Sequence, residues 1–163
     1  PHQGLKPQTK ARPATPMASY TLHTTAADYA RFLEAVLSGA GLKRATAKQW
    51  LHPKIGLFQR CIECLGSDRA EADQHVSWGL GWGLEPAQKT FFHWGDNGGV
   101  KAFATGSPAK RTAVVVLTNG SNGMAVMPEI IDQLMPGEHP AFTWLNYDRS
   151  TPAGGWLDWV RLP

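Results

Sequence analysis

Charged residues are scarce in this 163-residue sequence: they make up 18% of it, against roughly 25% in an average globular protein. The 16 Lys and Arg nearly balance the 13 Asp and Glu, and no basic run is interleaved with aromatic residues, so we expect no nucleic-acid partner. No apolar run approaches the roughly 20 residues that span a bilayer, so we expect no membrane span. Hydrophobic residues, at 42%, are enough for a single domain with its own core.

The sequence also lacks a starting Met and a signal peptide. It opens on PHQGLKPQTKARPATP, which is typical of the middle of a longer chain or of a processed protein. Residues 1–18 contain four prolines and predict an extended segment. Residues 139–163 are rich in Trp and turn residues and predict an irregular tail.

Cysteine occurs only at Cys61 and Cys64, as a single C-x-x-C pair. Such a pair alone is weak evidence for a metal or redox site. Zinc would need two further ligands, and the flanking His52 and His75 do not supply finger-like spacing. We therefore expect two thiols, or a local disulfide in an oxidising compartment, with no metal and no cofactor.

Hydrophobic periodicity predicts three helices. The clearest covers residues 25–38, where Thr24 or Thr25 can cap the start and SGAG provides glycines to end it. Its apolar face repeats with helical spacing through Tyr29, Phe32, Leu33, Val36 and Leu37. A shorter helix is predicted in KRATAKQWL (residues 43–51), and a third over residues 124–135 with Pro128 in its first turn.

Four segments predict strands. SWGLGWGLE (residues 77–85) alternates large apolar residues with glycines, which is typical of a strand packed closely against a flat neighbour. TFFHW, VKAFATG and TAVVVLTNG follow, separated by turn signals that permit two successive hairpins. We therefore predict an α/β (α+β) fold in which helices flank an antiparallel sheet of three to four strands.

No serine has the surroundings of a nucleophile. G-x-S-x-G is absent, and the S-x-x-K match at Ser107–Lys110 lies between two predicted strands, where it indicates a hairpin turn. His93 is the strongest polar candidate, because it ends an aromatic strand just before Gly95, where a ligand could approach the backbone. The alternative is a strand histidine that hydrogen-bonds a neighbour. Asp96 follows at i+3 and should point to the opposite face.

Four motifs in order carry a family resemblance: LHTTAADYARFL, WGLGWGL, HWGDNGGV and AVVVLTN. Over roughly residues 15–135 the sequence resembles the C-terminal part of the serine β-lactamase and penicillin-binding protein superfamily, in its class C and esterase-like branch. Val100 stands where that family usually has Phe. The resemblance implies a partial β-lactamase/transpeptidase-like fold, with residues 1–163 as one domain that lacks the N-terminal half carrying the S-x-x-K nucleophile.

The resemblance also implies site residues. HWG corresponds to the family box that is more often Lys-Thr-Gly, so His93 would replace the Lys and orient substrate or support proton transfer. Gly95 would belong to the same catalytic box, and the backbone N–H of Asp96 would be one oxyanion-hole donor. The substrate-binding positions would be Trp94, Asn97, Asn119 and Asn122.

The implied activity is hydrolysis of a β-lactam, a D-alanyl peptide or an ester through an acyl-enzyme. His in place of Lys favours the peptidase or esterase, because Lys is the better permanent charge for a β-lactam carboxylate. Partners would be a small acyl substrate in the intact protein, and the missing N-terminal half or a second copy of the chain. The source would be bacterial, with the periplasm favoured over the cytoplasm. We expect the chain alone to be inactive; the alternative is a non-catalytic domain that kept the fold and binds peptide.

Overall fold

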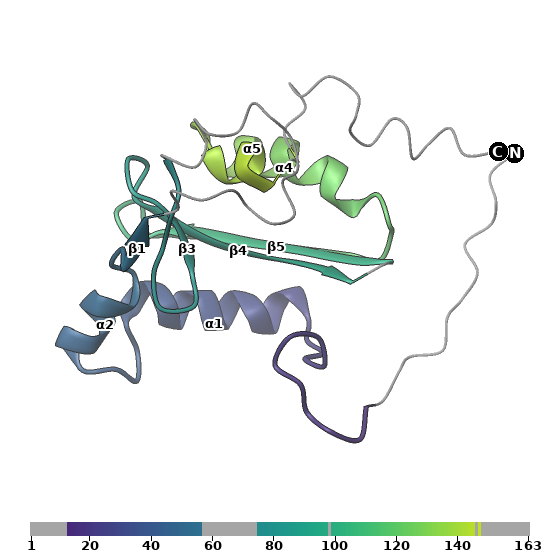
Figure 1. The fold of residues 1–163 in the computed structure, drawn as a ribbon, viewed down its shortest axis with the longest axis horizontal. Helices are drawn as coiled ribbons and strands as arrows, with labels where there is room; N and C mark the ends of the chain where they lie inside the picture. Colours follow the sequence, from purple (N-terminus) through teal and green to yellow (C-terminus); the bar gives the residue numbers. More distant parts are fainter. Residues whose placement is uncertain (1–12, 57–74, 98, 146, 148–163) are drawn as a thin grey trace, which may run out of the picture.

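The computed structural model describes residues 13–56, 75–97, 99–145 and 147. These residues form three layers with an antiparallel sheet in the middle (Figure 1). α1 (Ala26–Ser38) and α2 (Arg44–Trp50) lie on one face of the sheet, and α4 (Met127–Leu134) and α5 (Pro140–Leu145) lie on the other. The predicted α/β class with an antiparallel sheet and flanking helices is confirmed.

The described sheet has six strands, where the sequence predicts three or four. In sheet order, which is also chain order, they are β1 (Ile55–Gly56), β2 (Ser77–Trp78), β3 (Gly83–Glu85), β4 (Thr90–Asn97), β5 (Val100–Ser107) and β6 (Thr112–Thr118). Every neighbouring pair is antiparallel, so β4, β5 and β6 form the expected meander. The difference from four comes from β1, which the sequence does not predict, and from the segment 77–85, which forms two strands instead of one.

The prediction of one strand over residues 77–85 is wrong. The chain reverses between β2 and β3, and the Gly79 N–H donates to the Trp82 carbonyl oxygen at 2.8 Å. Gly81 takes a φ of +83°, a turn conformation that suits a residue without Cβ. The predicted close packing at the glycines is nevertheless present, because a Cβ on Gly83 would overlap the ring of Phe92.

Two of the helices have the predicted limits and signals. Thr25 caps α1 by accepting a hydrogen bond from the Asp28 N–H at 3.1 Å, and Gly39 ends the helix with a φ of +67°. α2 lies within the predicted residues 43–51. The third helix begins as a 3-10 turn, η1 (Gly123–Val126), and continues as α4 with Pro128 in its first turn.

The C-terminal tail differs from the prediction where it is described. Residues 140–145 form α5, in which Ala141, Phe142, Trp144 and Leu145 are buried against the sheet, so an irregular tail is wrong for this part. Several predictions fall outside the described residues: those for residues 148–163, for most of the extended segment 1–18 and for both cysteines. None of the described helices is both long and apolar enough to cross a membrane.

Each face of the sheet has its own hydrophobic core, because side chains alternate along β4 and β5. Phe92 and Phe103 pack with α4 and α5 on one face. Phe91 and Ala104 pack with Leu33 of α1 on the other. Both Phe91 and Phe92 are fully buried, so the beginning of β4 is the best-anchored part of the strand, and its far end carries the candidate site.

Candidate functional site

β4 is covered on one edge over only half its length. β3 pairs with Thr90, Phe91 and Phe92, whereas β5 pairs with β4 from Phe91 to Asn97. No other described strand pairs with residues 93–97, so this half of β4 presents one free edge. Alternate residues of an antiparallel strand aim their N–H and C=O groups at the same edge, and a free edge therefore offers a row of ladder hydrogen bonds.

His93 is the first residue of this half of β4, and its side chain lies among three indole rings. Its imidazole is 5.5 Å from the ring of Trp94, 5.9 Å from Trp78 and 6.2 Å from Trp82, measured between ring centroids. The side chain is half-buried and stays outside the two cores. Its Nδ1 lies 3.0 Å from the Trp94 carbonyl oxygen, which can only accept, so Nδ1 carries the proton and Nε2 is left as an acceptor in the neutral ring.

Asp96 lies three residues further along, on the opposite face of the strand. Its carboxylate pairs with the ammonium of Lys101, directly across the hairpin in β5. The Tyr147 hydroxyl donates to the second carboxylate oxygen, Oδ2, at 3.4 Å. The Asp96 side chain is 39% exposed and that of Lys101 is 10% exposed, so the pair bridges the surface and the interior at the end of the strand.

The remaining predicted residues lie at the same end of the sheet at different distances from the free edge. A Cβ added to Gly95 would meet only the Ala102 Cβ, at 3.8 Å, so the described chain leaves space there. Asn97 ends β4 and is exposed. Asn119 and Asn122 follow β6, two strands away, which corresponds to about 10 Å across the sheet.

The S-x-x-K match runs from the end of a strand into the predicted hairpin turn. Ser107 is the last residue of β5 and is completely buried, and Lys110 lies in the turn between β5 and β6. The Ser107 hydroxyl donates to the Lys89 carbonyl oxygen at 3.1 Å and accepts from the Lys110 backbone N–H at 3.4 Å. Ser107 also lies three residues along β5 from Ala104, the partner of His93, which is about 10 Å along the strand. It is therefore placed as a structural serine.

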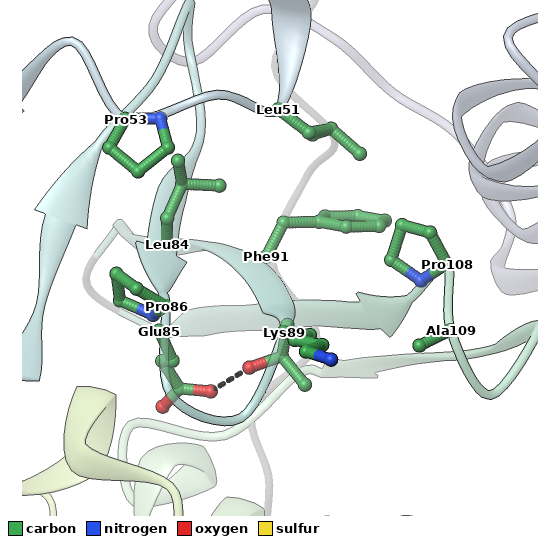
Figure 2. A pocket seen from close by; sticks show the side chains of 10 residues that line it. Leu51, Pro53, Leu84, Glu85, Pro86, Lys89, Phe91, Pro108 and Ala109 are labelled. Atoms are coloured by element: carbon green, nitrogen blue, oxygen red, sulfur yellow. Dashed lines mark hydrogen bonds between the residues drawn. The ribbon is translucent and has the colours of Figure 1, made fainter. Parts of the chain in front are cut away.

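A pocket of about 340 Å³ opens at the other end of β4 (Figure 2). Its walls include Leu51, Leu84, Phe91 and Pro108, and none of the predicted site residues lines it. Among the described residues, no segment lies opposite the free edge of β4 to close a cleft. The residues that line the pocket include no combination of nucleophile and base, so the candidate site remains at the HWG motif.

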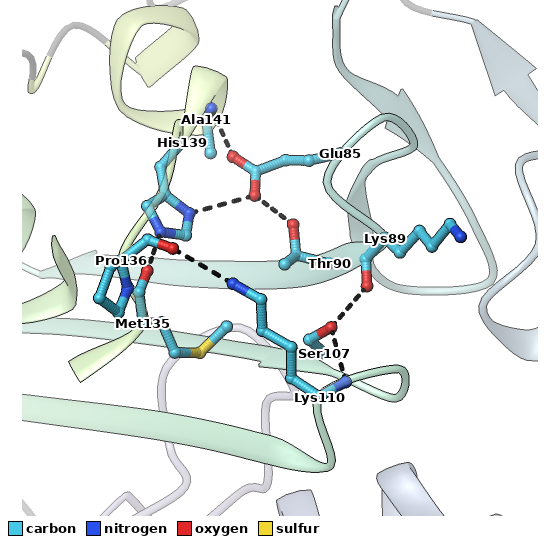
Figure 3. A network of polar contacts seen from close by, with 9 residues as sticks. All are labelled: Glu85, Lys89, Thr90, Ser107, Lys110, Met135, Pro136, His139 and Ala141. Carbon is cyan, nitrogen blue, oxygen red and sulfur yellow. Dashed lines mark hydrogen bonds and ion pairs between the residues drawn. The ribbon is translucent and has the colours of Figure 1, made fainter.

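A buried polar network that the sequence did not reveal joins β3 to α5 (Figure 3). The Glu85 carboxylate, 1% exposed, accepts hydrogen bonds from the Thr90 hydroxyl and, at 2.9 Å, from the Ala141 N–H. His139 places Nδ1 3.4 Å from Glu85 Oε2 and Nε2 2.9 Å from the Met135 carbonyl oxygen.

His139 in this network is held toward its charged form. Burial lowers the pKa of His139, but the hydrogen bonds to Glu85 and Met135 and the negative charge of Glu85 outweigh burial, and the pKa is raised. Both ring nitrogens face acceptors, which suits an imidazolium with two donors. The network has no free nucleophile, so it serves to fasten α5 over the sheet.

No group of three or more His, Cys, Asp or Glu side chains in the described ranges is arranged to hold a metal ion. The prediction for Cys61 and Cys64 falls on residues that lie outside those ranges.

Comparison with protein-family models matches residues 1–134 to the family described as Beta-lactamase. The match spans α1, the whole β-sheet and α4, and hence every residue of the free edge. No curated protein and no solved structure matches the chain.

Proposed function

Because the chain belongs to the beta-lactamase family, we propose that it forms the substrate-binding wall of a serine-dependent acyl-transfer site. The observation that carries the proposal is the free edge of β4 from His93 to Asn97, which includes the HWG motif. An extended acyl substrate can hydrogen-bond to such an edge as an additional strand would.

Asp96 is the proposed oxyanion donor through its backbone N–H. The backbone N–H groups of Phe92, Trp94 and Asp96 point to the same edge of β4, because their direction repeats every two residues. Phe92 pairs with Gly83 of β3 at this edge. A donor aimed at the position where negative charge develops contributes on the order of 3 kcal/mol to transition-state stabilisation. Gly95 keeps the approach to this N–H open.

His93 would orient the substrate or take part in proton transfer through Nε2, since Nδ1 is engaged by the Trp94 carbonyl. Trp94 and Asn97 flank the edge and would contact substrate. Asn119 and Asn122 would reach only a substrate that extends about two strands across the end of the sheet.

The nucleophile would come from polypeptide outside these 163 residues, either a preceding segment or a second subunit. Ser107 supports this, because it is buried at the end of β5 and its hydroxyl is hydrogen-bonded to backbone groups. The substrate is a small acyl compound: a β-lactam, a D-alanyl peptide or an ester. His93 in the Lys position favours the latter two, since Lys carries the more permanent charge for a carboxylate.

Hydrolysis of a chromogenic cephalosporin and a p-nitrophenyl ester tests the proposal. The 163-residue chain alone should show no hydrolysis above background, and the same chain joined to its preceding polypeptide should hydrolyse at least one substrate. Ser107→Ala should leave that rate unchanged. A rate in the isolated chain that disappears with Ser107→Ala would contradict the proposal.

A non-catalytic peptide-binding domain is the second candidate, and the free edge favours it equally, because main-chain pairing needs no nucleophile. A peptide ending in D-Ala-D-Ala separates the two candidates. Amide shifts at residues 93–97 without turnover in the longer protein would favour the binding domain, whereas turnover favours the enzyme.

A further inference from the structure

Lys101 is a buried cation whose only described ion pair is with the residue that we propose as oxyanion donor. Its residue exposure is 8%, and a lysine this buried is rare unless it is paired. The partner is the Asp96 carboxylate, its direct cross-strand neighbour in the β4–β5 register. The pair therefore joins the interior of the sheet to the exposed end of β4.

We infer that Lys101 is a positioning residue for the Asp96 amide and cancels the charge of the Asp96 carboxylate beside the developing oxyanion. This inference rests on the proposed function, and it assigns a role to a residue outside the HWG motif. It has two parts, a mechanical one and an electrostatic one, and each has its own measurement.

The mechanical part follows from how firmly each partner is held. Lys101 is paired on both sides, with Asp96 in β4 and Thr118 in β6, and its carbonyl oxygen accepts from the Thr118 hydroxyl at 3.3 Å. Gly123 packs closely against Lys101, since a Cβ added to Gly123 would lie 3.0 Å from the Lys101 Cβ. Among the strands that the structure describes, Asp96 is paired only by β5. Lys101 is therefore the more firmly held partner, and the ion pair restrains Asp96.

The electrostatic part follows from the position of the carboxylate. The Asp96 side chain starts from the same residue whose N–H would meet the oxyanion, so an uncompensated negative charge there would oppose the charge that forms during acyl transfer. The Lys101 ammonium neutralises it from the interior side, where its own charge is sheltered from water. Tyr147 donates a further hydrogen bond to the same carboxylate.

Amide hydrogen exchange in the chain itself tests the mechanical part. Lys101→Met keeps the aliphatic stem and removes the charge. We expect exchange at Gly95 and Asn97, whose N–H groups face β5 on either side of Asp96, to accelerate about 10-fold or more, while amides at the Phe91–Phe92 end stay protected. Lys48→Met is the matched control, because Lys48 is an exposed lysine on α2. Unchanged exchange at Gly95 and Asn97 in Lys101→Met overturns the inference.

Acylation kinetics in the longer protein test the electrostatic part. We expect Lys101→Met to lower kcat about 10- to 100-fold with a much smaller change in KM, a loss below the 10²–10³ of deleting a donor outright. Asp96→Asn added to Lys101→Met removes the uncompensated charge and should restore part of the rate, while the loss that comes from the loosened Asp96 amide remains. A purely structural role of Lys101 predicts no recovery in the double variant. That result would overturn the electrostatic part. If the unmodified longer protein has no activity at all, the proposed function fails, and the exchange measurement still decides the positioning role.

Discussion

Replacing Glu85 by Gln should destabilise the fold by an amount that can be worked out from its contacts. Glu85 is 1% exposed and its carboxylate accepts from Thr90 and Ala141 and faces His139. Removing one partner of a buried, hydrogen-bonded charge pair typically costs 3–5 kcal/mol, and we expect about 3 kcal/mol here because Gln retains one acceptor. Urea unfolding followed by Trp fluorescence would measure the loss.

The pH dependence of the same variant tests the reasoning more sharply. Because the pKa of His139 is raised in the folded protein, its stabilisation is complete below the unfolded value of about 6.5 and disappears as pH rises through the folded pKa. Relative to Glu85→Gln, the unmodified protein should thus gain stability as the pH falls through the raised pKa of His139 toward its unfolded value. Parallel stability curves for the two proteins over this range would refute the account of the network.

An exposed ion pair provides the control for this experiment. Asp28 and Arg31 pair on the surface of α1 with side chains 58% and 74% exposed. Exposed pairs contribute about 0–1 kcal/mol, so Asp28→Asn should cost less than Glu85→Gln and should not change the pH difference. An equal loss in both variants would mean that burial of Glu85 is not what gives the network its stabilising effect.

Two further predictions concern stability alone. Gly83→Ala places a Cβ against the Phe92 ring and should cost about 1–3 kcal/mol in urea unfolding, whereas Gly99→Ala, with open space around it, should cost less than 1 kcal/mol; equal losses would contradict the packing. Thr25→Ala removes the cap of α1 and should cost about 1 kcal/mol, clearly more than Thr24→Ala; a negligible loss would show that the cap does not stabilise α1.

Much of the fold could be predicted because its determinants are local. Thr25 and Gly39 mark the ends of α1 by cap chemistry, and the turn signals on either side of VKAFATG define the meander. The segment 77–85 was misleading because a two-residue turn at Gly81 interrupts an alternation that continues on both sides of it. α5 has only six residues, and its burial depends on Glu85, more than fifty residues away in sequence.

The site shows the same division between local and distant information. His93, Gly95 and Asp96 belong to one motif, and the sequence predicts them together. The Asp96–Lys101 pair could be predicted from the sequence, since the two residues lie at equal distances from the centre of the N-G-G-V turn. They therefore face each other across the hairpin. The Tyr147–Asp96 and His139–Glu85 contacts join residues 51 and 54 positions apart, for which the sequence contains no local signal.

The distance from the Asp96 backbone nitrogen to the carbonyl oxygen of a trapped acyl group tests the central claim most directly. A crystal structure of the longer protein, acylated on its nucleophilic serine by a slowly hydrolysed substrate, would provide it. Our account predicts about 2.7–3.1 Å, with the acyl chain lying along residues 93–97. An acyl oxygen bound elsewhere, with the His93–Asn97 edge covered by another strand, would contradict it.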